Sequence, residues 1–379
     1  MKTSILARAQ EAKLMAKPVY TAFLALLLHS GWSVSVDAAT ATRGLPGAVP
    51  CSAELYETLR AVPDDVSLVQ PVACKVDLTR DDMVTTNIAF LGAHASGASL
   101  DCHGGIIGIP GRVPKGTPPT IQIRSVKDEQ GKWNVPRNIT IRNCRIYGSI
   151  RISGLGINGE AENVRQSSLN RNHTEFAQAS APSNIVLENL TIVADGPTPV
   201  FIAPGVTKVT LSHSVISGFT NGTAVYLDSE TGHNVISGNR FEVTTKSREV
   251  MSVDGSAHNV IENNSFTNPE HGGIYLYRNC GQGGTIRHQT PQHNRISGNT
   301  FVYQDLPHPK PAVWLNAHEA WQNFYCNNDP PAPFGSGADN RSFADFNTVT
   351  NNQIVGGDAK LILDNGKNNN LSGNIQKAK

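Results

Sequence analysis

A four-residue pattern that alternates apolar and polar positions recurs along most of the chain. In every copy the first and third positions are aliphatic, whereas the second and fourth positions vary. The eight copies span residues 121–124, 150–153, 200–203, 225–228, 251–254, 274–277, 313–316 and 361–364. Side chains alternate between the two faces of a β-strand, so this pattern predicts eight strands that each bury one face in a core.

A second repeat, punctuated by asparagine, lies between these strands. It is clearest at 233–241, 258–266 and 293–301, with weaker copies at 138–146, 184–192, 208–216, 347–354 and 370–375. The closest copies lie 22 to 26 residues apart, and β-rich units this short must stack to bury an apolar face. At one position of five copies stacked amides are expected to hydrogen-bond along the stack: Asn239, Asn264, Asn299, Asn352 and Asn374.

Together the two patterns specify a parallel β-solenoid. From about residue 76 onward the asparagine-punctuated rungs resemble the right-handed parallel β-helix superfamily of pectin-lyase-like proteins. The resemblance implies an all-β fold, a single-stranded right-handed parallel β-helix, and permits polysaccharide lyase, hydrolase or epimerase activity. The chain lacks the Asn-x-Asp, Asp-Asp and Gly-His-Gly set of the polygalacturonases and the Asp-Pro-His signature of the mannuronan epimerases, so it matches no specific enzyme family.

The N-terminal segment has the features of an export signal. Residues 1–38 combine a basic start, a short apolar core at 22–28 and a small-x-small cleavage site at 36–38. The apolar core is too short to span a bilayer, although a retained N-terminal anchor is the alternative. We expect residues 39–75 to form an N-terminal segment whose helix near 53–62 caps the stack, and residues 76–379 to form the β-helix.

Charge narrows the expected partners. Removing residues 1–38 takes away four basic and two acidic residues, which leaves 28 basic and 29 acidic residues and a formal charge of −1. A chain this close to neutral has no general attraction for nucleic acid or anionic membranes. From the signal segment we expect a protein that is secreted or periplasmic and without a transmembrane anchor after signal cleavage. A monomer is expected as well.

The cysteines predict disulfides. An even number of cysteines in an exported protein favours disulfide pairing, and no spacing here resembles a zinc site. Six cysteines allow fifteen pairings, among which the order along the chain favours Cys51 with Cys74, Cys102 with Cys144, and Cys280 with Cys326.

The second and fourth positions of the strands are expected to face outward. Insertions at 154–183, 278–292 and 317–346 all follow strands, so they would wall one side of this face and leave a groove for an extended ligand. A polysaccharide is the expected ligand, with Asn316 and four outward aromatics as candidate binding residues. The aromatics are Phe201, Tyr226, Tyr275 and Trp314, which could instead form a satellite core beneath the loops.

Two aspartates are the sharpest candidates for chemistry. Asp228 and Asp254 occupy the same column on consecutive rungs, so their carboxyl groups would lie about 5 Å apart, the spacing of a retaining glycosidase pair. Repulsion would also raise the pKa of one of them. The same pair could bind Ca²⁺ through its carboxylate oxygens, or could be two solvated aspartates bonded to turn amides.

A neighbouring set suits elimination from a uronic acid, which needs the carboxylate neutralised and the C5 proton removed. Arg278 could do the first, and Tyr277, His271 or His288 the second. Glu249 has inward parity and is expected in a turn, from which it either bonds backbone or reaches the groove. The histidines at 233, 258 and 293 share one repeat position, which predicts a structural ladder.

The sequence therefore favours a secreted polysaccharide-cleaving enzyme, by a narrow margin a lyase. The alternatives are a glycoside hydrolase that uses the two aspartates and a non-catalytic glycan-binding or envelope β-helix protein.

Overall fold

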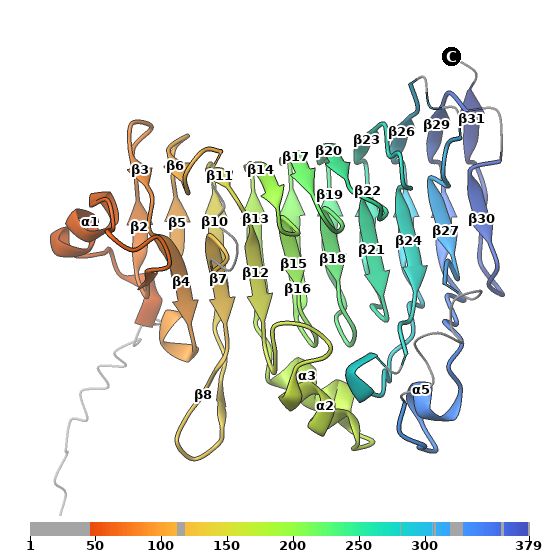
Figure 1. Ribbon diagram of the computed structural model, residues 1–379, viewed down its shortest axis with the longest axis horizontal. Helices are drawn as coiled ribbons and strands as arrows, with labels where there is room; N and C mark the ends of the chain where they lie inside the picture. Colours follow the sequence, from red (N-terminus) through yellow and green to blue (C-terminus); the bar gives the residue numbers. More distant parts are fainter. Residues whose placement is uncertain are drawn as a thin grey trace, which may run out of the picture. The chain divides into compact units, whose positions relative to one another are not determined.

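The chain winds in coils of three short strands. The computed structural model describes residues 46–111, 118–280, 282–304, 306, 308–318, 329–357 and 360–377, which belong to one unit, Arg43–Lys379. Each strand pairs in parallel with the equivalent strand of the next coil, so three long parallel sheets run along the stack (Figure 1). The predicted β-solenoid is confirmed. The expected signal segment, 1–38, lies outside the described residues.

The first sheet contains the alternating pattern. Two strands precede the eight that alternation predicts, so the stack begins before residue 76. The strands are β1 (Val69–Pro71), β4 (Asn87–Leu91), β7 (Ile121–Arg124), β12 (Ile150–Ser153), β15 (Val200–Ile202), β18 (Val225–Leu227), β21 (Met251–Asp254), β24 (Ile274–Tyr277), β27 (Val313–Leu315) and β30 (Ile362–Asp364).

The register of the last strand differs from the prediction. Val313 pairs with Ile362 instead of Leu361, and Asp364 pairs with Leu315. The run Leu361-Ile362-Leu363 is apolar throughout, so alternation alone cannot choose between its two phases. Asp364 therefore does not share the column of Asp228 and Asp254.

The other two sheets complete each coil. The second sheet consists of β2 (Lys75–Asp77), β5 (Ser99–Asp101), β10 (Arg137–Arg142), β13 (Ser183–Glu188), β16 (Thr207–Ser212), β19 (Val235–Ser237), β22 (Val260–Glu262), β25 (Arg295–Ser297) and β28 (Thr348–Thr350). The third consists of β3 (Met83–Val84), β6 (Ile106–Ile107), β11 (Arg145–Tyr147), β14 (Thr191–Gly196), β17 (Val215–Thr220), β20 (Arg240–Thr245), β23 (Ser265–Thr267), β26 (Thr300–Val302), β29 (Gln353–Val355) and β31 (Ile375–Lys377).

Ladders of identical side chains hold successive coils in register. The Asn264 side-chain amide donates to Asn299 Oδ1 at 3.0 Å and accepts the Asn239 amide at 3.0 Å, and the row continues to Asn374 as predicted. A second buried row links the asparagines at 234, 259, 294 and 347. Inside the stack, Phe241, Phe266 and Phe301 lie face to face at 4.7 and 4.6 Å.

The histidine repeat is structural, as predicted. The His258 ring stacks on His233 at 5.0 Å and on His293 at 5.1 Å, and all three residues have positive φ angles of 57° or 58°. They occupy the left-handed turn position beside the second asparagine row.

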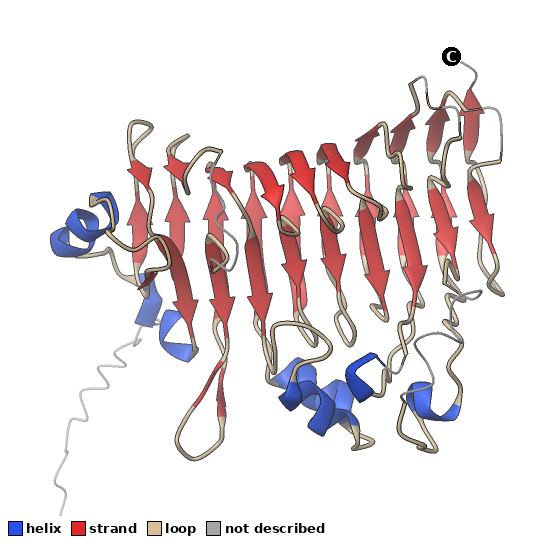
Figure 2. Ribbon diagram, viewed as in Figure 1, coloured by secondary structure: helices blue, strands red, loops and turns tan. Residues whose placement is uncertain are grey.

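The insertions project from one edge of the first sheet, because they follow parallel strands (Figure 2). They were expected as polar loops, but the first contains two helices, α2 (Glu162–Ser168) and α3 (His173–Ala179). Outside these insertions, residues 126–134 form a small antiparallel hairpin of β8 (Val126–Lys127) and β9 (Trp133–Asn134). The helices are η1 (Pro46–Ala48), α1 (Ala53–Arg60), η2 (Ala93–Ala95), α2 (Glu162–Ser168), α3 (His173–Ala179), η3 (Gln282–Gly284) and α5 (Gly335–Ala338). No helix among the described residues is both long and apolar enough to cross a membrane.

The predicted N-terminal helix is α1, which packs on the first coil. Ser52 Oγ accepts the Leu55 backbone N–H, and Leu59 is fully buried in the main core. The helix ends at Arg60, two residues before the predicted end, and Val62 is 79% exposed.

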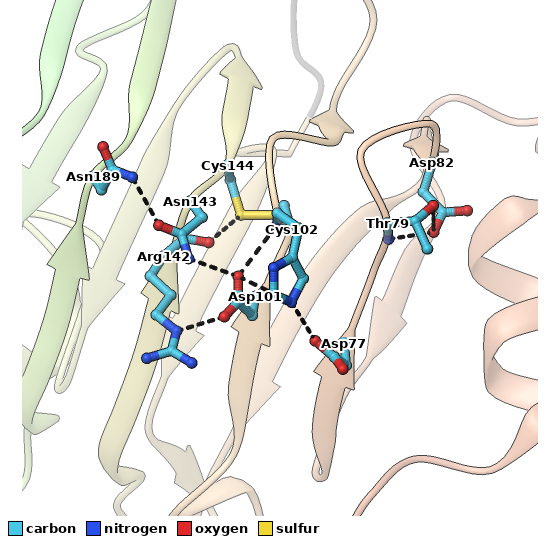
Figure 3. Close-up of a disulfide and its surroundings, with 10 residues drawn as sticks. Asp77, Thr79, Asp82, Asp101, Cys102, Arg142, Asn143, Cys144 and Asn189 are labelled. Atoms are coloured by element: carbon cyan, nitrogen blue, oxygen red, sulfur yellow. Dashed lines mark hydrogen bonds and ion pairs between the residues drawn. A yellow bond between two sulfur atoms is a disulfide. The ribbon is translucent and has the colours of Figure 1, made fainter.

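Two of the three expected disulfides are confirmed, Cys51–Cys74 and Cys102–Cys144. The second joins neighbouring coils beside a polar cluster in which Asp101 accepts from Arg142 and Asn143 (Figure 3). Cys280 is disulfide-bonded as well, whereas Cys326 lies outside the described residues, so that pairing stays a prediction.

Candidate functional site

A cavity of about 250 Å³, which we call the central cavity, lies on the outward face of the first sheet. All three predicted wall insertions contribute to it, together with the middle residues of β15 and β18 and residues next to strands β18 and β21. Its lining consists of Asn158, Gly159, Glu160, Phe201, Tyr226, Asp228, Arg248, Asn279, Arg287 and His318. The outward face is therefore enclosed over these rungs.

The four outward aromatics divide into two groups. Phe201 and Tyr226 line the central cavity and stack at 5.0 Å with an interplanar angle of 1°. Tyr275 and Trp314 meet edge to face at 5.4 Å and pack with Tyr277 in a small core under the loops. The satellite-core interpretation therefore holds for Tyr275 and Trp314. Sugar binding by Phe201 and Tyr226 stays a prediction.

Asp228 is a buried carboxylate at the cavity wall. Its side chain is 4% exposed, and its oxygens accept the backbone N–H groups of Gly159 at 3.0 Å and Ser229 at 2.8 Å. Arg287 Nη1 lies 3.6 Å from Asp228 Oδ1. Burial raises the pKa of Asp228 to about 6, with Arg287 opposing the rise and Asp254 adding to it. This carboxyl group therefore titrates near pH 6, above the usual range of an aspartate.

Asp254 is on the next rung, but it lies beneath the cavity. It is fully buried, and it does not contribute to the cavity lining. Its carboxylate accepts Tyr226 Oη at 2.7 Å, the Asn279 backbone N–H at 2.8 Å and the Asn279 side-chain amide at 2.7 Å. Asp254 thus fixes two residues of the lining, and the expected open pair of aspartates is not formed.

Glu249 and Tyr277 form a buried network behind Arg248. Tyr277 Oη donates to Glu249 Oε1 at 3.0 Å, Ser252 Oγ donates to the same oxygen, and Arg248 Nη2 lies 2.9 Å from it. Burial raises the pKa of Tyr277 well above its usual value, and the side chain is fully buried, so it does not face the cavity as predicted. The network holds Arg248 against the cavity instead.

The remaining predicted residues lie away from the central cavity. The Arg278 guanidinium is buried and donates to the carbonyl oxygens of residues 287, 339 and 341, so it ties two wall insertions together. His288 Nε2 lies 2.7 Å from Ser168 O, and His271 contacts Thr245. Asn316 bonds the backbone of residues 344 and 365. None of these four side chains lines the central cavity, and their proposed roles toward a ligand stay predictions.

Sequence reasoning missed the three most basic groups of the lining: Arg248, Arg287 and His318. Arg248 precedes a strand, and the other two lie in insertions that carry no periodic signal. His318 stacks on Tyr277 with ring centroids 3.6 Å apart, and burial lowers its pKa. Burial thus favours the neutral imidazole over the imidazolium.

Metal ligands are poorly available at the two aspartates. Both carboxylates already accept hydrogen bonds from protein donors, which a cation would have to displace. In the described part of the chain, a group of three potential ligands occurs elsewhere, at Asp77, Asp101 and His103, with ligand atoms within 4.8 Å. There His103 lies 2.7 Å from Asp77 and Arg142 lies 2.6 Å from Asp101. Calcium binding by Asp228 and Asp254 stays a prediction.

Comparison with known proteins agrees with the architecture. The family described as "Right handed beta helix region" matches residues 134–305. This chain has the fold of a right-handed parallel β-helix. No curated protein matches the sequence.

Among solved structures, endo-xylogalacturonan hydrolase from Aspergillus tubingensis is similar with a TM-score of 0.45 and 11% identity, over 82% of this chain and 83% of that chain. An alginate lyase from Paenibacillus sp. is similar with a TM-score of 0.40 and 13% identity, over 86% and 97%.

Proposed function

We propose that this β-helix protein cleaves a uronic-acid-containing polysaccharide by β-elimination in the central cavity. The observation that carries the proposal is the lining itself. It combines a carboxyl group with a raised pKa, a histidine with a lowered pKa, two arginines and a stacked aromatic pair within one cavity.

The arginines suit an acidic sugar. Arg248 reaches the cavity with a side chain that is 37% exposed, and Arg287 is buried with its Nε free of any hydrogen bond within the described chain. A cation placed at the uronate carboxylate stabilises the negative charge that spreads onto it when the C5 proton leaves. The Phe201–Tyr226 stack offers an apolar surface for the sugar ring.

The surroundings of Asp228 and His318 give the first the role of acid and the second the role of base. In the proposed reaction neutral His318 removes the C5 proton, and protonated Asp228 gives its proton to the departing O4 as the C4–O4 bond breaks and the C4–C5 double bond forms. Burial favours the required form of each group, because it disfavours both the charged carboxylate and the charged imidazolium.

The hydrolase alternative that pairs Asp228 with Asp254 is less well supported. A retaining mechanism needs two carboxyl groups at the glycosidic bond, and Asp254 is covered by Tyr226 and Asn279. The non-catalytic alternative needs no acid or base, so it leaves the opposite pKa shifts in one cavity without a role. Two disulfides are consistent with export into an oxidising compartment.

The test is turnover of uronate-containing glycans, followed by the ultraviolet absorbance of the unsaturated product. We expect His318→Gln and Asp228→Asn each to lower the rate by about 100-fold or more, the usual size of a general acid–base contribution. The matched control is His293→Asn, in the exposed histidine ladder, where asparagine tolerates the left-handed backbone. New reducing ends without the absorbance would overturn elimination, and no turnover of any uronate glycan would favour the binding protein.

A further inference from the structure

A second cavity, of about 340 Å³, lies outside the central cavity, between the β8–β9 hairpin and helices α2 and α3. We call it the hairpin cavity. Its volume falls in the range of roughly 300–1,000 Å³ that is typical of small-ligand sites. The insertion at 154–183 contributes residues to both cavities, Asn158–Glu160 to the central one and α2 and α3 to this one.

The aromatic part of the hairpin cavity is anchored on one side and open on the other. Trp133 is half-buried and packs against a small core formed by Leu155, Val164 and Ala177. Phe176, on α3, also lines the cavity and is 43% exposed. An indole held by a core yet facing a cavity presents a rigid apolar surface, which matches the C–H face of a sugar ring.

Side-chain amides that make few or no hydrogen bonds surround the Trp133 surface. The Asn163 and Asn172 side chains line the cavity, are exposed and make no hydrogen bond with the described residues. Asn170 makes only long contacts, at 3.3 and 3.4 Å, to backbone carbonyls of α2. A carboxamide both donates and accepts, so a ring of such groups matches neighbouring sugar hydroxyls.

One charge distinguishes the lining. Lys127 is the single charged residue of the hairpin cavity as the structure describes it, and its Nζ lies 5.8 Å from the Trp133 ring centroid. A sugar ring that rests on Trp133 would therefore bring a ring carboxylate close to a cation. We propose that the hairpin cavity is a second glycan-binding site, selective for uronic-acid units and separate from the site of cleavage.

The test is calorimetric titration of the full chain with a galacturonate hexasaccharide and with a neutral gluco-hexasaccharide. Using Asp228→Asn as the parent slows any turnover during the titration. We expect Trp133→Ala to weaken hexagalacturonate binding by about tenfold, or to remove one class of sites, because a ring contact of about 1.4 kcal/mol is lost. Lys127→Gln should weaken binding of the acidic ligand several-fold and leave the neutral ligand unchanged.

Lys246→Gln, an exposed lysine outside both cavities, is the control and should change neither affinity. Unchanged hexagalacturonate binding in both Trp133→Ala and Lys127→Gln would overturn the proposal. So would a loss confined to Trp133→Ala together with a lowered melting temperature. The comparison does not require turnover, so it stands or falls separately from the proposed elimination.

Discussion

Asp228 and Asp254 show how strongly the surroundings of a residue determine its role. They follow the same column on neighbouring strands, and sequence alone treats them alike. Asp254 is saturated by Tyr226 and Asn279 and supports the lining, whereas Asp228 faces the cavity with a raised pKa. The column could be predicted from alternation, but the loops that cover Asp254 could not, because loops carry no periodic signal.

The raised pKa of Asp228 makes stability depend on pH. The folded protein binds this proton more tightly than the unfolded chain, so the contribution is fully present below about pH 4 and is lost as pH rises through about 6. Asp228→Asn removes this term. The difference in unfolding free energy, variant minus wild type, should therefore increase by up to about 3 kcal/mol as pH rises from 4 to 7. Urea unfolding at the two pH values measures it, and a difference that does not change with pH would contradict the assignment.

Arg248 gives a second prediction at this scale. It is held by Glu249 and Tyr277 and is the more exposed of the two cavity arginines. Arg248→Gln should lower kcat/KM for a uronate substrate by about 10- to 100-fold, because a charge-assisted contact of about 1.5–3 kcal/mol is lost. Arg240→Gln, an exposed arginine on the third sheet, should leave it unchanged. An equal loss in both variants would indicate a general charge effect instead.

The arrangement of the strands is set more by the side-chain ladders than by the alternation within each strand. Alternation found eight of the ten strands of the first sheet and misjudged one phase, at Leu361-Ile362-Leu363, where no polar residue marks the outward side. Helices α2 and α3 escaped prediction because each has only seven residues and neither has a side-chain N-cap bond. Short uncapped helices are fixed by packing, which sequence periodicity does not report.

The asparagine ladder can be tested at its centre. Asn264 is buried, donates to Ile236 O and Asn299 Oδ1, and accepts from Asn239. Asn264→Ala leaves buried partners without bonds, so we expect a loss of about 2–4 kcal/mol in unfolding free energy. Gln353→Ala, an exposed position on β29, should cost less than about 0.5 kcal/mol. Similar denaturation midpoints for both variants would show that the ladder contributes little.

At the scale of the whole molecule, the stack is a one-dimensional array in which each coil contacts its neighbours. Stability is then local, and an end can open without the rest. The Cys102–Cys144 disulfide closes a separation of 42 residues near the N-terminal end. The central cavity lies further along the stack, where three insertions meet over the first sheet. A substitution that loosens the N-terminal coils should therefore leave the central cavity folded.

Removing that disulfide should therefore loosen the N-terminal coils first. In Cys102→Ser/Cys144→Ser we expect a loss of about 2–5 kcal/mol in those coils. Limited proteolysis should cut before residue 150 while the rate on uronate glycan at low temperature stays near that of wild type. Uniform loss of protection along the chain would contradict a local role.

The central claim is elimination in the central cavity, and mass spectrometry of the products tests it most directly. Elimination breaks an oligouronate without adding water, so the two product masses should sum to the substrate mass, and His318→Gln should abolish their formation. Products whose masses sum to the substrate plus one water would show hydrolysis and contradict the account.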